Sequence, residues 1–388
     1  MTGHTRIDAD AAALAPAATG GSAQARIEAE VMGNKAGSSP TSGPPSLQIR
    51  ETAPRSVSFG AMAWRRYRAD RVGMTALVVV LGFVLLIAAA ASGLVAGDWQ
   101  RELALSYAPP GFVGPAAAVQ QAAAIKAGEL TDLSDVDPLA PRYGEWAERA
   151  AKLQQAEPPR ASTLPWGADR LGRDVFAKAV QGSKISILVG VLAALVATLI
   201  GTVLGALAGF LGGKVGDALE WLYNVFTSIP SILLIFAFAA VSGRGVASVV
   251  LILGLTGWPG IYRLVRAEFM KHARRDYVRA AEALGASSSA RMFRHILPNV
   301  SHVVLVQLSI HVVGFIKSEV ILSYLGLGVS LDQVSWGTML AEAQSELILG
   351  YWWQLAAATL LMASFVTAFS LMTDALRDAL DPKLRGLE

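Results

Sequence analysis

Residues 185–213 read ISILVGVLAALVATLIGTVLGALAGFLGG and contain no charged side chain. A transmembrane helix needs about 20 consecutive apolar residues, so this run predicts a helix that crosses a membrane. Small residues recur in it every four positions, which places them on one helix face and lets a second helix approach closely. The alternative is that these glycines line a substrate path. The expected packing seam consists of Ala193, Ala197, Gly201, Gly205, Gly209 and Gly213.

Five further apolar runs extend this pattern along the chain. The composition agrees, because 53% of the residues are hydrophobic and only 16% are charged, against roughly 25% charged residues in soluble domains. We therefore expect an all-α polytopic membrane protein with six transmembrane helices. Pro230 should kink or break the third span, since proline removes a backbone donor and crowds the preceding turn, and Pro259 should terminate the fourth. The further runs lie at residues 72–97, between Glu220 and Arg244, between Arg244 and Arg263, and at residues 298–316 and 347–373.

The distribution of Lys and Arg predicts the orientation of these spans. Cytoplasmic segments of membrane proteins carry an excess of basic residues close to the helix ends. With a cytoplasmic N-terminus, the basic clusters at 65–71, 263–294 and 377–385 fall inside, and the short outer connections carry only Arg244 and Lys317. Both termini are therefore expected in the cytoplasm. The net charge of +3 is interpreted as this topology signal and not as a sign of a nucleic-acid partner.

The basic segment at residues 263–297 is too polar to enter the bilayer and predicts two short helices joined by a tight turn. Gly285 suits the left-handed cap that ends a helix, and Ser287 or Ser288 suits the N-cap of a second one. From the pattern alone, the segment also fits an amphipathic hairpin lying on anionic lipid. The first helix should carry an apolar stripe at i, i+3, i+4 and i+7, formed by Tyr277, Ala280, Ala281 and Leu284.

This hairpin resembles the EAA loop of ABC importer permeases. The resemblance includes the intervals from the alanines to the glycine and from the glycine to Leu-Pro. Arg279 stands where the loop has an acidic residue, and His295 stands where it has isoleucine. The resemblance implies that the hairpin couples the spans to a separate ATPase subunit, in whose groove it sits. The matching residues are Arg279, Ala280, Ala281, Gly285, Leu297 and Pro298.

Other segments narrow the resemblance to the dipeptide, oligopeptide and nickel permeases, and within them to the C-type subunit. They occur in the order typical of that subunit and extend over most of the chain from Phe59 to Arg385. One departure is Ala168, which replaces a threonine. The segments are AWRRYR at 63–68, GADRLGRDV at 167–175, LSYLGLG at 322–328, SWGTML at 335–340 and DALRDALDP at 374–382.

The resemblance implies a type I ABC importer permease fold in the bacterial inner membrane. It implies three kinds of partner besides membrane lipid: a second, B-type permease, two ABC ATPase subunits that bind ATP and Mg²⁺, and a periplasmic or lipid-anchored peptide-binding protein. The implied function is ATP-driven import of dipeptides or oligopeptides, in which this chain forms half of the translocation pathway. Other cargoes, such as nickel chelates, glutathione or a peptide antibiotic, stay open. An ATP-independent channel or secondary carrier is the alternative outside this class.

The expected organisation follows from the spans and the resemblance together. Residues 1–58 are rich in Ala, Gly, Ser and Pro and predict a disordered cytoplasmic tail. An N-terminal segment and first span occupy 59–97, and a long periplasmic loop occupies 98–184, with short helices expected around 116–127 and 144–157. The core permease domain occupies 185–376 and contains the coupling loop at 263–297. Residues 377–388 form a cytoplasmic C-terminal tail.

The sequence carries no recognisable chemistry of its own. It lacks the G-x-x-x-x-G-K-[ST] loop that cradles phosphates, so we expect no catalytic residue and no bound cofactor. It contains no cysteine, and His302 and His311 fall on opposite helix faces, so no metal site is expected. Lys317 should reach the outer membrane interface, and Glu319 is a candidate for an outer gate or for contact with the binding protein. No substrate-binding residue can be assigned.

Overall fold

The computed structural model describes residues 59–114, 137–153, 160–330 and 332–380. The chain divides into two units, Met1–Ser56 and Val57–Glu388, and the described residues all belong to the second. The expected N-terminal tail and the helix around 116–127 lie outside the described residues. Of the expected C-terminal tail, residues 377–380 still belong to the last helix, and the rest lies outside the described part.

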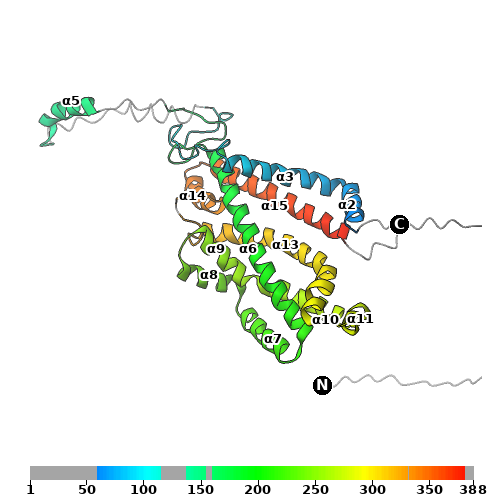
Figure 1. Ribbon diagram of the computed structural model, residues 1–388. Helices are drawn as coiled ribbons and strands as arrows, with labels where there is room; N and C mark the ends of the chain where they lie inside the picture. Colours follow the sequence, from blue (N-terminus) through cyan, green and yellow to red (C-terminus); the bar gives the residue numbers. More distant parts are fainter. Residues whose placement is uncertain (1–58, 115–136, 154–159, 331, 381–388) are drawn as a thin grey trace, which may run out of the picture. The chain divides into compact units, whose positions relative to one another are not determined.

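The described part of the chain is helical, which confirms the expected all-α class (Figure 1). Five helical stretches are long and apolar enough to cross a membrane, and a bent pair of helices makes a sixth if it is one span. The elements are α2 (Phe59–Ala69), α3 (Arg71–Ala91), η1 (Ala140–Arg142), α5 (Tyr143–Leu153), α6 (Val175–Leu211), α7 (Gly213–Thr227), α8 (Ser231–Ser242), α9 (Val246–Thr256), α10 (Trp258–Ala273), α11 (Asp276–Ala283), α12 (Ser288–Ala290), η2 (Arg291–Ile296), α13 (Leu297–Tyr324), α14 (Trp336–Ile348) and α15 (Trp353–Leu380).

Helix α6 is the central element of the fold and packs against α9, α10 and α13. It begins at Val175, because the side chain of Asp174 accepts hydrogen bonds from the Phe176 and Ala177 amides at 2.8 and 3.3 Å. The last ten residues of the expected periplasmic loop are therefore helical. With 37 residues, α6 is about 56 Å long at 1.5 Å per residue, well beyond a hydrocarbon core of about 30 Å.

Two breaks interrupt the helices that follow α6. Pro230 lies between α7 and α8, which meet at an angle of 83°, so the break expected there is confirmed. The second is a one-residue interruption at Gly257, between α9 and α10, where the backbone keeps φ −89° and ψ −5° and the Gly257 amide donates to the Leu253 carbonyl at 2.9 Å. The expectation that Pro259 ends a span was wrong: it lies in the first turn of α10, where the missing amide hydrogen is not needed, and the span continues to Ala273.

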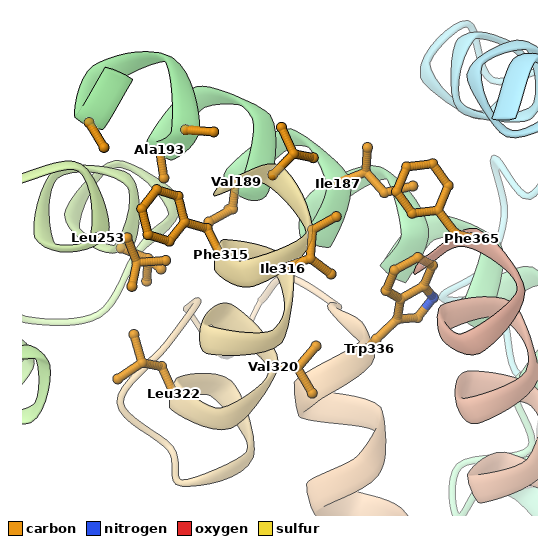
Figure 2. Packing of buried hydrophobic residues seen from close by; sticks show 14 of the residues in the cluster. Ile187, Val189, Ala193, Leu253, Phe315, Ile316, Val320, Leu322, Trp336 and Phe365 are labelled. Carbon is orange, nitrogen blue, oxygen red and sulfur yellow. The ribbon is translucent and has the colours of Figure 1, made fainter. Parts of the chain in front are cut away.

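The main hydrophobic core lies where α6, α9, α13, α14 and α15 meet. Figure 2 shows Phe315 of α13 between Leu253 of α9 and Val189 of α6, with Ile316 of α13 and Phe365 of α15 farther along the same cluster. These residues are less than a tenth exposed. Because side chains from all of these helices fill one close-packed space, the core fixes the mutual positions of the spans.

The two ends of the long connection after α3 pair with each other and form its base. Residues 102–110 pair with residues 161–173 through short backbone bridges, including Ala104 with Ala161 and Pro110 with Leu164. The Leu105 amide donates to the Ala161 carbonyl at 2.9 Å, and the Gly111 amide donates to the Leu164 carbonyl at 2.8 Å. Within this connection α5 lies inside the stretch 144–157, apart from its first residue, where a helix was expected.

Candidate coupling site

The hairpin expected at residues 263–297 is built on a glycine turn. Gly285 has φ +85°, a conformation that side chains with a Cβ adopt at a cost. Its amide donates to the Glu282 carbonyl at 2.9 Å, and the Ala286 amide donates to the Ala281 carbonyl at 3.0 Å. These two bonds form a Schellman motif that closes α11. The Ser287 hydroxyl then accepts the Ala290 amide at 3.3 Å and starts the second arm.

The side of α11 that packs inward differs from the expected stripe. Val278 and Ala281 are buried, whereas Ala280 is exposed and Leu284 is 90% exposed. The stripe of Tyr277, Ala280, Ala281 and Leu284 was therefore wrong in two of its four members. The periodicity of a two-turn helix fits two overlapping stripes, and the tertiary contacts select the one that contains Val278. Its partners in the buried cluster include Val265, Phe269, Met292 and Ile296.

Charged contacts tie the two arms together. Arg291 in η2 pairs with Glu282 in α11 at 2.6 Å, and its guanidinium lies 5.4 Å from the ring centroid of Phe210 in α6. Arg279, in the position that is acidic in the EAA loop, is exposed. One side of the hairpin is therefore held by contacts with the rest of the protein, and the other side, which carries Arg279 and Leu284, is exposed.

The second arm runs into the membrane span without a gap. η2 is a π-helix that ends at Ile296, and Leu297 and Pro298 form the first turn of α13. The Asn299 side chain donates to the His295 carbonyl at 2.7 Å, close to the proline that lacks a donor of its own. A single helical stretch, Ser288–Tyr324, thus joins the hairpin to the span.

The glycines of α6 lie against α10, the helix that leads into the hairpin. A Cβ added at Gly201 would lie 2.7 Å from the Trp258 carbonyl oxygen, one at Gly205 would lie 2.7 Å from that of Tyr262, and one at Gly209 would lie 2.5 Å from that of Arg266. Real Cβ atoms do not approach so closely, so these positions require glycine.

The expected seam needs one correction. Gly213 does not belong to it, because α6 ends at Leu211, Gly212 has φ +59°, and Gly213 begins α7. A Cβ added at Gly213 would meet nothing within 4 Å. Ala193 and Ala197, earlier on α6, are completely buried. The close approach therefore ends at Gly209.

A buried ion-pair network, which the sequence analysis missed, joins the segment before α6 to α14 and α15. Asp169 is fully buried, and its Oδ2 lies 2.8 Å from Lys178 Nζ and 2.6 Å from a guanidinium nitrogen of Arg173. Lys178 also pairs with Glu342 and donates to Gln354 Oε1 at 3.3 Å. Burial acts to raise the pKa of Asp169, but the Lys178 charge and the hydrogen bonds from Arg173 and Lys178 outweigh it and hold the pKa below its usual range.

Glu346 is a further buried acid beside this network. It is 1% exposed, and neither of its carboxylate oxygens has a hydrogen-bond partner among the described residues. Burial raises the pKa of Glu346 to about 7; the Lys178 charge opposes this shift, and the Asp169 and Glu342 charges add to it. Glu346 therefore ionises near neutral pH.

Glu319, the candidate for an outer gate, is buried in α13. Its Oε1 accepts a hydrogen bond from the Ser323 hydroxyl at 2.6 Å, and its Oε2 has no partner among the described residues. Ser323 Oγ in turn accepts the Val329 amide at 3.3 Å. In this conformation Glu319 is inaccessible to a binding protein, whereas Lys317 on the same helix is exposed.

The SWGTML segment holds helices together at the start of α14. Ser335 and Thr338 form a reciprocal capping box, which closes the first turn of a helix. The Trp336 amide donates to Ser186 Oγ at 3.1 Å, and its indole nitrogen donates to the Ala179 carbonyl at 3.3 Å. The residues of this segment that carry the resemblance therefore position α14 against α6.

Histidines do not gather into a metal centre. Within the described ranges there is no group of three or more His, Cys, Asp or Glu side chains that could hold a metal ion. His272 Nδ1 lies 2.8 Å from the Tyr277 hydroxyl, and His311 Nε2 lies 3.3 Å from the Gln307 amide nitrogen. These histidines take part in contacts within or next to their own helices.

Comparisons with known proteins identify the family. Residues 201–386 match the family described as binding-protein-dependent transport system inner membrane component. The chain is 35% identical over 247 residues to the oligopeptide transport system permease protein OppC of Bacillus subtilis (strain 168), covering 64% of this chain and 81% of OppC. It is 29% identical over 330 residues to the dipeptide transport system permease protein DppC of the same strain, covering 85% of this chain and 88% of DppC.

A third relative carries a different cargo name. The chain is 38% identical over 221 residues to the glutathione transport system permease protein GsiD of Salmonella paratyphi A (strain ATCC 9150 / SARB42), covering 57% of this chain and 73% of GsiD. The matched proteins are permeases and not ATPases, and the family description names a binding protein. The chain therefore belongs to the binding-protein-dependent transport system inner membrane components, and is a multi-pass inner-membrane permease of an ABC importer that works with separate ATPase and binding-protein partners.

Proposed function

We propose that this permease imports short peptides and that the coupling loop at residues 263–297, which contains the hairpin of α11 and η2, couples it to the ATPases. The observation that carries the proposal is the continuity of the hairpin with α13: a turn closed by a Schellman motif leads, through η2, into a span without a gap. A rigid element of this kind transmits a domain movement, whereas a flexible loop absorbs it. The peptide cargo is inferred from the relatives named OppC and DppC.

The proposal includes the finer composition of the complex. This chain pairs with a second, B-type permease, and two ATPase subunits bind ATP and Mg²⁺ on the cytoplasmic side, where the hairpin and both termini lie. A periplasmic or lipid-anchored protein delivers the cargo on the other side. The basic residues of the hairpin, such as Arg274, Arg275 and Arg279, support this orientation.

The packing suggests how closure of the ATPases reaches the pathway. Movement of the hairpin acts on two helices at once, on α13 by direct continuation and on α10 through the buried cluster in which Val278 and Met292 lie together with Phe269. Helix α10 is held against α6 by the close contacts at Gly205 and Gly209. The three helices therefore move as one body, as required of a coupling element.

Glutathione is the second candidate cargo, because GsiD is 38% identical to this chain over the matched residues. Glutathione has a peptide backbone, so both cargoes require the same type of pathway. Competition separates them: uptake of a labelled dipeptide is measured with an excess of unlabelled dialanine, triglycine, glutathione or a nickel chelate. The competitor that inhibits at the lowest concentration identifies the cargo class.

The coupling role is tested by replacing Gly285 with valine. A β-branched residue at φ +85° is strained by at least about 1–2 kcal/mol, so Gly285→Val should distort the turn while leaving the spans intact. We expect insertion into the membrane to persist and co-purification with the ATPases, or dipeptide uptake, to be lost. Gly285→Asn is the matched control, because asparagine tolerates the left-handed conformation. Undiminished uptake by Gly285→Val would refute the coupling role.

A further inference from the structure

The two helix breaks after α6 open onto the same cavity. Residues around Pro230, between α7 and α8, and around Gly257, between α9 and α10, line a cavity of about 520 Å³ together with residues 310–318 of α13. Non-helical backbone at membrane depth is tolerated only where protein covers it or where it lines a water-filled space. The break at Pro230, where α7 and α8 meet at 83°, and the one-residue interruption at Gly257 therefore face one cavity.

The lining of this cavity is uncharged. None of its described lining residues is Asp, Glu, Lys or Arg. Several hydroxyl groups in the lining are already used, because Thr227, Thr256 and Ser318 donate to carbonyl groups of their own helices at 2.9, 2.7 and 3.1 Å. The cavity thus offers no ionic partner and few free hydrogen-bonding groups, which disfavours selection by cargo charge.

His311 is the exception in this lining. Its Nδ1 is buried and has no hydrogen-bond partner among the described residues, and such an atom is unfavourable unless a ligand or water satisfies it. Its ring stacks on Phe315 with centroids 5.3 Å apart. A Cβ added at Gly257 would lie 2.2 Å from Phe315 Cζ, and one at Gly260 would lie 3.7 Å from His311 Nε2. The absence of side chains at Gly257 and Gly260 therefore lets Phe315 and His311 pack close to the backbone.

We propose that this cavity is the stretch of the pathway in which this subunit contacts its cargo, and that the His311 ring turns when cargo enters, so that its unpartnered Nδ1 forms a hydrogen bond with a main-chain amide or carbonyl group of a peptide. The inference rests on the proposed function and adds the site and its chemistry. An uncharged cavity of this size fits a small ligand, and main-chain groups are the polar feature that all peptides share. The site therefore accepts peptides of differing side chains.

Single cysteines test whether cargo occupies the cavity, because the natural chain contains none. Gly314 lines the cavity, and a Cβ there would meet nothing within 4 Å; Gly82 is the control, an exposed and unobstructed position on α3 outside the lining. In the assembled importer with its binding protein and ATP, a small methanethiosulfonate reagent should modify Gly314→Cys, and dialanine should slow that reaction. Dialanine should have no effect on Gly82→Cys.

Labelling of Gly314→Cys that does not change with dialanine, in an importer that transports dialanine, would overturn the cavity assignment. Absence of labelling at Gly314→Cys in that same active importer would overturn it too. In both cases the proposed function would stand. By contrast, failure of the chain to co-purify with ATPases would refute the proposed function itself, so the two failures are distinguishable.

Substitution of His311 tests its hydrogen bond. His311→Leu removes the polar group and His311→Gln keeps one, and His302→Leu changes another histidine of α13 that lies outside the cavity lining. A hydrogen bond of about 0.5–1.5 kcal/mol corresponds to a loss of about two- to tenfold in kcat/KM for dialanine uptake. We expect that loss for His311→Leu, recovery in His311→Gln, and unchanged ATPase co-purification in both. An equal loss in His302→Leu, or none in His311→Leu, would overturn the role of His311.

Discussion

Replacing the glycines of α6 that face α10 with alanine should destabilise the protein, although alanine has the higher helix propensity. A Cβ at Gly205 would lie 2.7 Å from the Tyr262 carbonyl oxygen, and one at Gly209 would lie 2.5 Å from that of Arg266. Backbone atoms cannot turn aside as a flexible side chain does, so α10 has to shift. Overpacking costs about 1–3 kcal/mol per site, and alanine gains about 1 kcal/mol over glycine in a helix. The double variant Gly205→Ala/Gly209→Ala should therefore lose about 2 kcal/mol.

The measurement is thermal unfolding of the purified permease in detergent, followed by size-exclusion chromatography of the fraction that stays monodisperse. Gly82→Ala is the control, because its Cβ would meet nothing within 4 Å, and it should gain up to about 1 kcal/mol from propensity alone. The two variants should thus shift the melting temperature in opposite directions. A double variant that melts at or above the wild-type temperature would refute the close packing of α6 and α10.

Three further predictions concern the end of α6 that carries the ion pairs. Burial raises the pKa of Glu346 to about 7, above its usual value near 4.5. The contribution of Glu346 to the folding free energy is therefore complete below pH 4.5 and is lost as the pH rises through 7. Glu346→Gln should raise the melting temperature at pH 8 and hardly change it at pH 4.5. Lys178→Met leaves the fully buried Asp169 without one of its cationic partners and should cost about 3–5 kcal/mol, part of which Lys178→Met/Asp169→Asn should restore in the same melting assay. Ser335→Ala removes the cap of α14 and should cost about 1 kcal/mol, whereas Ser335→Thr should melt close to wild type.

Much of the fold could be predicted because the relevant signals are local. The apolar runs predict spans through the length of a helix in a bilayer, and Pro230 predicts a break through its missing amide hydrogen. Gly285 predicts the end of α11 through its conformational freedom. Each of these signals depends on a few consecutive residues, so no knowledge of the tertiary structure is needed to interpret it.

The remainder depends on partners that are distant in the sequence. Nothing near Lys178 predicts that Glu342 and Gln354 meet it, since those contacts span more than 160 residues. The inward face of α11 was also misassigned, because the packing of Val278 on α10 decides it and the local stripe does not. The expectation for Pro259 was wrong because a proline either follows the end of a helix or lies in the first turn of the next one. Here the interruption falls at Gly257, so Pro259 lies in the first turn of α10.

For the coupling site, the sequence predicted the turn but not what holds it. The intervals around Gly285 and Pro298 located the hairpin, whereas the contacts of Arg291 with Glu282 and Phe210 follow only from the fold. The cavity at the two breaks had no signal in the sequence beyond Pro230. The sequence excluded His311 as half of a metal pair with His302, and its unpartnered ring nitrogen becomes evident only once α13 is placed in the fold.

The paired base of the long connection after α3 has a practical consequence. Its two ends leave and re-enter the protein at neighbouring points, at the bridge between Pro110 and Leu164. Changing the number of residues between these two points therefore changes the free energy of folding through loop-closure entropy, by about 0.6 kcal/mol for each doubling of length. A protein engineer should therefore be able to insert an epitope or a fluorescent reporter between these two ends while the paired base stays intact.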